Sequence, residues 1–302
     1  MKKVFSLILV FCLCFSLCSC SGTADFTVGI CQLTDFDSHN KATVGFIEAL
    51  KEELAKNGKT VKIEQRIVEK AEFCKKSIED LTALKVDLIM ACSTPALLAA
   101  ADCTVNTPVV GTLVTDYHYA FVNNIPKNVT GTSDAVPFEE QAKMMVESLK
   151  LIAGDKVGII YCSKEANSTI QLSEIKKSFE AYGIVLNAYP FTEISELQTV
   201  TATAALENKA VYLPSDNTVA YNEKTIGIIC SQNKIPVFTA YGGDICYASL
   251  TVDYYALGRE AGKMAAEILL NNKTPEEFEI LSLSPIAVYN KEICNELGIT
   301  VP

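Results

Sequence analysis

Short runs of β-branched and other apolar residues alternate with longer amphipathic stretches along almost the whole chain. The first run, Phe26 to Leu33, predicts a buried strand. Residues 40–56 then have apolar side chains at helical spacing, which predicts a helix that ends before Gly58 and faces the core through Val44, Ile47, Leu50 and Leu54. Further strands are predicted at 61–68, 86–91 and 109–114, and a second helix at 70–84. Strands and helices in this order indicate a parallel sheet with helices on both faces.

The same pattern begins again after a turn-rich segment. Residues 123–137 contain two prolines and a Thr-Gly-Thr-Ser-Asp run, and they predict the crossing between two modules. Beyond it the pattern predicts helices at 137–150, 167–182, 195–206 and 220–232, and strands at 156–161, 184–189, 210–213 and 236–239. The fold class that follows is α/β, with two doubly wound parallel-sheet lobes in tandem.

The last fifty residues are too few to bury a core of their own. They predict strands at 250–254 and 286–289 and helices at 256–270 and 291–297. We expect this tail to return to the lobes already built, so that a multi-crossing hinge joins them and a cleft lies between them. The N-terminal lobe would comprise 26–133 plus about 250–280, and the C-terminal lobe 134–249 plus about 281–302.

The N-terminus has the pattern of a bacterial lipoprotein signal. Lys2 and Lys3 precede an apolar run of about 14 residues, which matches the core of a secretory signal and is short for a membrane span. The run ends in Leu-Cys-Ser-Cys, which resembles a lipobox with Cys20 as the acylated residue. This predicts a signal peptide over 1–19, a lipidated (palmitate-bearing) tether over 20–25, and a body anchored to the membrane that faces the periplasm or the exterior. An ordinary signal peptide or a short N-terminal anchor is the alternative.

Charge and cysteine placement exclude several classes of function. The formal net charge is −10, and cleavage would remove two lysines, so the body lacks the basic surface that nucleic acid requires. Eight cysteines lie beyond the signal, without a CxxC pair, and several fall inside apolar runs. We expect mostly free, buried thiols, with one or two disulfides as the alternative. The two histidines, His39 and His118, lack ligand-type neighbours, so we expect no metal and no cofactor.

Three predicted strands end in unusually polar turns, where open α/β sheets bind ligands. In Ser93-Thr94-Pro95 the hydroxyls cap a helix, and the free N–H groups of that helix suit a carboxylate. The second turn contains Ser163, Glu165 and Asn167. The third contains Asp216 and Asn217, and the Asp216 carboxylate could receive an ammonium group or could simply be a helix cap. Thr115 and Asp116 close another strand in the same way.

Donors on one lobe and acceptors on the other suit a zwitterion such as an α-amino acid. Aromatic residues could then contact its side chain, and Phe36, which follows Gln32 at the end of the first strand, and Tyr241 are the candidates.

These residues resemble, in order, the ABC-transporter substrate-binding proteins of the tryptophan/tyrosine type, from about Thr27 to Ile299. The matching segments are Val28 to Gln32, Val86 to Ala96, Val129 to Asp134, Ser163 to Ser168, Pro214 to Val219 and Asp253 to Met264. After Gln32 the chain differs from the family pattern, with Asp35-Phe36-Asp37. The resemblance implies a type I periplasmic binding protein fold, a carboxylate contact at Thr94, cleft residues at Glu165, Asn167, Asp216 and Asn217, and a return crossing near the hinge at Asp253.

We therefore expect a lipoprotein that binds a small solute, most simply an amino acid, with aromatic amino acids among the candidates, and delivers it to an ABC permease and its ATPase. We expect it to act as a monomer and to contact the membrane only through its lipid. The alternatives are a sensing partner for a membrane receptor, or import of another solute such as a nucleoside or sugar. No Gly-x-Ser-x-Gly, Gly-x-Gly-x-x-Gly or HExxH motif occurs, so we do not expect an enzyme. The candidate ligand-binding residues are Gln32, Phe36, Ser93, Thr94, Thr115, Asp116, Ser163, Glu165, Asn167, Asp216, Asn217, Tyr241 and Asp253.

Overall fold

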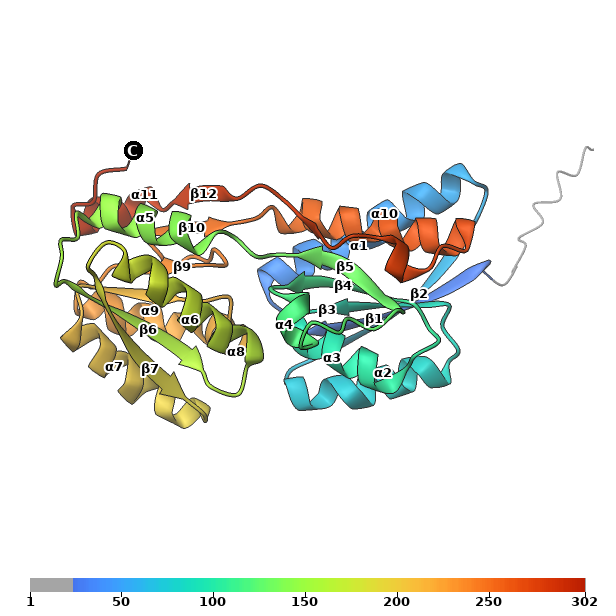
Figure 1. Cartoon of the computed structure of the whole chain (residues 1–302), viewed down its shortest axis with the longest axis horizontal. Coiled ribbons are helices and arrows are strands. Elements are labelled where there is room, and N and C mark those ends of the chain that lie inside the picture. Colours follow the sequence, from blue (N-terminus) through green and yellow to red (C-terminus); the bar gives the residue numbers. More distant parts are fainter. Residues whose placement is uncertain (1–23, 302) are drawn as a thin grey trace, which may run out of the picture.

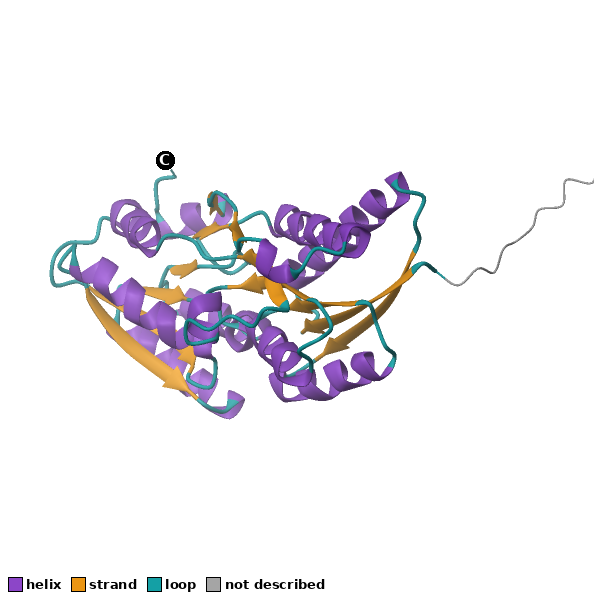
Figure 2. Cartoon of the chain, turned by 45° about the vertical axis from the view of Figure 1, so that its right-hand side comes forward, coloured by secondary structure: helices purple, strands orange, loops and turns teal. Residues whose placement is uncertain are grey.

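The computed structural model describes residues 24–301 and has two six-stranded sheets, one toward each end of an elongated molecule (Figure 1). Helices lie on both sides of the strands in each half (Figure 2). This is the predicted α/β architecture with two parallel-sheet lobes. The predicted signal peptide, Cys20 and most of the tether lie outside the described residues.

The first sheet has the strand order β11-β5-β4-β3-β1-β2, and every neighbouring pair is parallel. Its strands are β1 (Phe26–Leu33), β2 (Val61–Val68), β3 (Leu88–Cys92), β4 (Val109–Val114), β5 (Val129–Ser133) and β11 (Leu281–Ser282). The three central strands β3, β4 and β5 are buried throughout, as strands covered on both faces must be.

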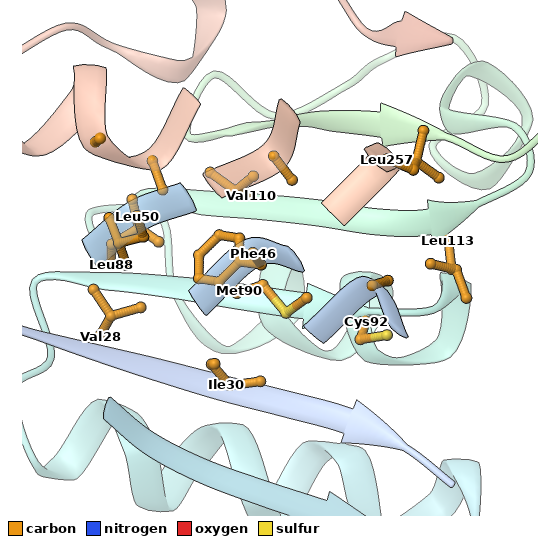
Figure 3. Packing of buried hydrophobic residues seen from close by; sticks show 14 of the residues in the cluster. Val28, Ile30, Phe46, Leu50, Leu88, Met90, Cys92, Val110, Leu113 and Leu257 are labelled. Atoms are coloured by element: carbon orange, nitrogen blue, oxygen red, sulfur yellow. The ribbon is translucent and has the colours of Figure 1, made fainter. Parts of the chain in front are cut away.

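Helices of the first lobe form two layers around this sheet. They are α1 (Asp37–Lys56), η1 (Ala71–Phe73), α2 (Cys74–Ala83), α3 (Thr94–Cys103), α4 (Tyr117–Ala120), α10 (Tyr254–Asn271) and η3 (Pro275–Glu277). Figure 3 shows Phe46 of α1 close to Met90 and Val110, and Leu257 of α10 nearer to Leu113. A separate core on the opposite face joins α2, α3 and α4 to the same strands.

The second sheet has the order β12-β10-β9-β8-β6-β7, parallel except for the antiparallel pair β10–β12. Its strands are β6 (Lys156–Cys162), β7 (Val185–Phe191), β8 (Ala210–Leu213), β9 (Val237–Thr239), β10 (Ala248–Thr251) and β12 (Ile286–Tyr289). One face is covered by α5 (Phe138–Leu149), α6 (Ala166–Glu180) and α11 (Lys291–Leu297). The other face is covered by η2 (Ile194–Glu196), α7 (Leu197–Glu207), α8 (Asn217–Tyr221) and α9 (Glu223–Gln232).

The chain passes between the two sheets three times: after β5, after β10 and after β11. The tail therefore returns to both lobes, as the sequence predicts, because α10 packs on α1 and β12 completes the second sheet. We propose that the lobe boundaries fall in these three connections, and the membership of the strands in the two sheets supports this placement.

The structure differs from the sequence predictions at four places. Residues 129–133 form strand β5 rather than part of a crossing, because the sheet buries their hydroxyls and Thr112 bonds Thr132 at 2.9 Å. The strand predicted at 250–254 ends at Thr251, since Asp253 caps α10. The helix predicted at 220–232 is interrupted at Asn222 and begins earlier, as α8. Val44 faces away from the core, with 47% of its surface exposed.

The eight cysteines of the described chain are free thiols, and all except Cys103 are buried, which confirms the expectation drawn from their placement. Within residues 24–301, no helix is both long and apolar enough to cross a membrane.

Close contact between α1 and α10 depends on glycines. A Cβ on Gly258 would lie 1.9 Å from the carbonyl oxygen of Ala42, and a Cβ on Gly45 would lie 2.2 Å from that of Tyr255. Backbone atoms cannot move aside as a flexible side chain can, so a methyl group at either position separates the helices.

We predict that Gly258→Ala lowers the free energy of unfolding by about 3 kcal/mol, the upper end of the usual cost of overpacking. Alanine's better helix propensity, worth about 1 kcal/mol, would not offset this. Urea denaturation followed by circular dichroism measures the change. Val44→Ala on the outer face of α1 is the control and should stay within about 0.5 kcal/mol of the parent. Equal stability of the two variants would contradict the close contact.

Candidate functional site

A cavity lies between the lobes at the carboxyl ends of strands from both sheets. It contains about 360 Å³ of space that protein atoms do not fill, part of it continuous with solvent. Its wall is made by residues at the ends of β1, β3, β4, β5, β6, β8, β9 and β10, or in the loops and first helical turns that follow these strands: Ser38, His39, Thr94, Leu113, Thr115, Asp134, Asn167, Ser215, Asp216, Asn217, Ala220, Tyr241 and Tyr254. Parallel sheets place ligands at this edge.

The first lobe presents helix starts and hydroxyl groups to the cavity. Ser38 and His39 lie in the first turn of α1, whose N-terminus has no side-chain cap. Thr94 begins α3, where the Ser93 hydroxyl accepts a long hydrogen bond of 3.5 Å from the amide of Ala96. Backbone N–H groups at such helix starts favour a negatively charged ligand group.

The backbone of the first lobe is irregular beside the cavity. Ser93 has φ of 106° and Leu113 has φ of 53°, and the register of β4 against β5 shifts between Gly111 and Val114. Conformations of this kind are costly for residues with a side chain and are concentrated at binding sites. Thr94 directly after Ser93, and Thr115 two residues after Leu113, both line the cavity.

The second lobe presents amide and carboxylate oxygens. Asn167 donates from Nδ2 to the carbonyl oxygen of Ser215 at 2.5 Å, which fixes its amide orientation and leaves the buried Oδ1 without a hydrogen-bond partner. Asp216 differs, because both of its oxygens are engaged. It accepts hydrogen bonds from the amides of Val219 (2.8 Å) and Cys162 (2.7 Å) and from the Ser168 hydroxyl (2.6 Å).

Burial, followed by the neighbouring Glu165, raises the pKa of Asp216, while those three hydrogen bonds act in the opposite direction. Both carboxylate oxygens of Glu165 also accept hydrogen bonds from the protein. It accepts from the amide and side chain of Asn217 at 3.0 and 2.7 Å and from the amide and hydroxyl of Thr218 at 2.8 and 2.6 Å. The two carboxylates hold the start of α8 and so position Asn217 at the cavity.

Two contacts join the lobes beside the cavity. His39 Nε2 lies 3.1 Å from Asn217 Oδ1, and burial lowers the pKa of this histidine to about 4, so the ring is neutral at pH 7 and can donate from Nε2. The ring of Phe36 meets Tyr241 edge to face with centroids 6.1 Å apart, and Phe36 packs against the core of the second lobe.

Asp134 is the most unusual group in the wall. It follows β5 in the first crossing between the lobes, only 8% of it is exposed, and its Oδ1 has no hydrogen-bond partner. Burial raises the pKa of this carboxyl to about 6, while the Thr115 hydroxyl beside it partly opposes the shift.

The structure brings together six of the candidate ligand-binding residues: Thr94, Thr115, Asn167, Asp216, Asn217 and Tyr241. The others lie outside the wall and have structural contacts. Gln32 bonds the loop and first turn of α1 through Thr34, Asn40 and Thr43. Ser93, Asp116 and Asp253 cap helices α3, α4 and α10, Ser163 bonds the Phe191 carbonyl oxygen, Glu165 holds α8, and Phe36 packs on Tyr241.

Sequence reasoning missed Ser38, His39, Leu113, Asp134, Ser215, Ala220 and Tyr254. A signal for Asp134 existed, because residues that follow a strand are site candidates, but Val129 to Ser133 was interpreted as a crossing. His39 was considered only as a metal ligand. Among residues 24–301 no cluster of His, Cys, Asp or Glu could hold a metal ion.

Comparisons with known proteins show the family of the chain. The family model described as ABC transporter substrate binding protein matches residues 27–302. A tyrosine-binding protein of Clostridioides difficile (strain R20291) is 30% identical over 250 residues, which are 80% of this chain and 72% of that protein.

Solved structures show that the chain shares its fold with other binding proteins. An ABC domain in complex with L-Trp from Streptococcus pneumonia superposes with a TM-score of 0.83 at 26% identity, covering 91% of this chain and 96% of that one. The ligand-free, open structure of a Clostridium difficile substrate-binding protein with adhesive properties gives 0.68 at 27% identity, covering 92% and 96%. A glucose-galactose binding protein from Geobacillus stearothermophilus, at 14% identity and a TM-score of 0.63, shares the type I periplasmic binding protein fold, covering 87% and 97%.

The family match spans nearly the whole chain and its two-lobed architecture, and the family consists of binding proteins rather than enzymes. This chain belongs to the ABC transporter substrate-binding proteins.

Proposed function

We propose that this protein binds an α-amino acid, preferably an aromatic one, in the cavity between its lobes and delivers it to an ABC permease. The observation that carries the proposal is that one cavity contains both groups suited to an anion and free acceptors suited to a cation. Uncapped or weakly capped helix starts and hydroxyls line the first lobe, at Ser38, Thr94 and Thr115. Unpaired oxygen acceptors line the opposite wall and the crossing, at Asn167 and Asp134.

These two kinds of group suit the two ends of a zwitterion. The ligand's carboxylate would accept hydrogen bonds from the N–H groups at the starts of α1 and α3, because helix N-termini favour anions. The ligand's ammonium group would donate hydrogen bonds to the free acceptors. A neutral sugar or nucleoside would satisfy hydroxyl donors but would leave a buried carboxylate without a counter-charge.

Aromatic side chains in the wall support the preference for an aromatic ligand. Tyr241 and Tyr254 are buried and line the cavity together with Leu113 and Ala220. Relatives described as binding tyrosine and L-Trp point to the same ligand class.

The lobe arrangement resembles the ligand-bound relative more than the open one. The TM-score is 0.83 against the L-Trp complex and 0.68 against the ligand-free, open structure, although the identities are 26% and 27%. The His39–Asn217 and Phe36–Tyr241 contacts across the cavity support a closed arrangement. A ligand that contacts both lobes would favour this state over the open one, and the closed state would be recognised by the permease.

The delivery role also requires a location outside the cytoplasm. We propose that residues 1–19 are cleaved, that Cys20 carries the lipid anchor, and that the monomer faces the periplasm or the cell exterior, where it meets the permease and its ATPase. The lipobox-like Leu-Cys-Ser-Cys sequence supports this placement.

We predict that L-tryptophan or L-tyrosine at one hundred times its Kd stabilises the folded protein by about 2.7 kcal/mol, which raises Tm by several degrees. A thermal-shift screen followed by calorimetry tests this against glucose, ribose, adenosine and L-lysine. A response only to a sugar or nucleoside would overturn the proposal of an amino acid ligand. If none of these solutes stabilises the protein and the protein co-purifies with a membrane receptor, the sensing role would be favoured.

Replacement of the lipid acceptor tests the location. Cys20→Ser should prevent acylation and move the protein from the membrane fraction to the medium or periplasmic extract, because residues 24–301 contain no helix that could cross a membrane. Metabolic labelling with a palmitate analogue and fractionation measure this. Cys103→Ser, a partly exposed cysteine in the body, is the matched control and should leave both unchanged. Continued labelling of the Cys20 variant would refute the lipobox.

A further inference from the structure

We propose that Asp134 is the residue that binds the ligand's ammonium group, and that it restricts the site to amine-bearing ligands. The proposal rests on the proposed function and adds a specific role for one residue. Sequence reasoning favoured Asp216 for this role.

Asp134 is a buried carboxylate with unused hydrogen-bonding capacity. Only 8% of its surface is exposed, it lines the interlobe cavity, and its Oδ1 accepts no hydrogen bond from the protein. A buried acceptor without a donor is costly, and a binding site is a common reason for keeping one.

The charge of Asp134 is also uncompensated. The titratable groups that face it are Cys92 at the end of β3, Tyr117 of α4 and Tyr254 of α10, and burial raises the pKa of each. All three are therefore neutral at pH 7. The cavity wall contains no Lys or Arg, and the His39 ring is neutral. A cationic ligand group supplies the counter-charge that this part of the chain lacks.

Asn167 complements Asp134 from the other lobe. Its Nδ2 donates to the Ser215 carbonyl oxygen, which leaves the buried Oδ1 without a partner in a residue that lines the same cavity as Asp134. An ammonium group has three donors and can use both. Asp216, by contrast, already accepts three protein hydrogen bonds and caps α8, so its carboxylate holds the fold.

Affinity for matched ligand pairs tests the role. L-tryptophan is compared with indole-3-propionate, and L-tyrosine with 3-(4-hydroxyphenyl)propionate, each of which lacks only the amine. Asp134→Asn should weaken binding of the amino acids on the order of 10- to 100-fold, as expected for loss of a charged hydrogen bond. Binding of the amine-free analogues should be unchanged or stronger, because no buried charge is then left unpaired. Asp116→Asn is the control, because Asp116 caps a helix outside the cavity and asparagine can keep that cap. It should change the affinity for neither the amino acids nor the amine-free analogues.

The pH dependence separates an ionised Asp134 from a protonated one. Binding to an ammonium group requires the carboxylate, and in the free protein the pKa of Asp134 is about 6. Amino acid affinity of the parent protein should therefore be about tenfold weaker at pH 5 than at pH 7.5. The part of this difference that is due to Asp134 should disappear in Asp134→Asn, whereas contributions from Glu223 and Asp216, whose pKa values burial also raises, would remain in both proteins. Affinity that rises toward pH 5 would mean that Asp134 donates a proton instead, and would overturn the proposal.

The unliganded protein provides a second readout. Because burial raises the pKa of Asp134 above its unfolded value of 3.8, the stability associated with this group is present below about pH 4 and is lost as pH rises through 6. Asp134→Asn should thus raise Tm at pH 7.5 and leave it unchanged at pH 4. A lower Tm at pH 7.5 would show that the charge has a partner in the protein.

The outcomes distinguish the two proposals. If the parent protein binds neither L-tryptophan nor L-tyrosine, the proposed function fails and this role falls with it. If the parent binds an amino acid and Asp134→Asn binds it equally well, the function stands and only the role of Asp134 is wrong.

Discussion

The structure depends on two parallel sheets that present their strand ends to each other. Parallel strands are buried on both faces, so the central strands β3, β4 and β5 consist of buried residues from end to end. The polar residues of the cavity wall lie beyond the ends of the strands. Three crossings join the lobes and bring the carboxyl ends of eight strands around one cavity.

Polar groups at this edge are of two kinds. One kind is satisfied within the protein: Glu165 and Asp216 hold the start of α8, and Gln32 holds the start of α1. The other kind is buried and unsatisfied, as at Asp134 and Asn167. The first kind stabilises the positions of the wall residues, and the second leaves hydrogen-bonding capacity that a ligand can use. Our proposals rest on this distinction rather than on residue type, because aspartates belong to both kinds.

Contacts between the lobes explain how binding could be coupled to shape. His39 and Phe36 of the first lobe reach Asn217 and Tyr241 of the second, at positions next to the cavity. These contacts are few, and they involve one hydrogen bond and one aromatic pair. A ligand that contacts both walls would add to them, which suits a protein of the ABC transporter substrate-binding family.

The sequence by itself determined the α/β class, the two lobes, most element positions and the family, because hydrophobic periodicity and strand-end motifs are local signals. It also placed Thr94, Asn167 and Asp216 at the cavity, since the strand-end rule applies to each strand separately. Only the tertiary structure decided which polar groups are satisfied and which are free. The Ser168 hydroxyl and the Cys162 amide donate hydrogen bonds to Asp216 from outside its own turn. Residues 129–133 form a strand because they pair with β4 inside the sheet. Long-range partners of this kind leave no local pattern, so Asp134 became visible as a site residue only in the folded chain.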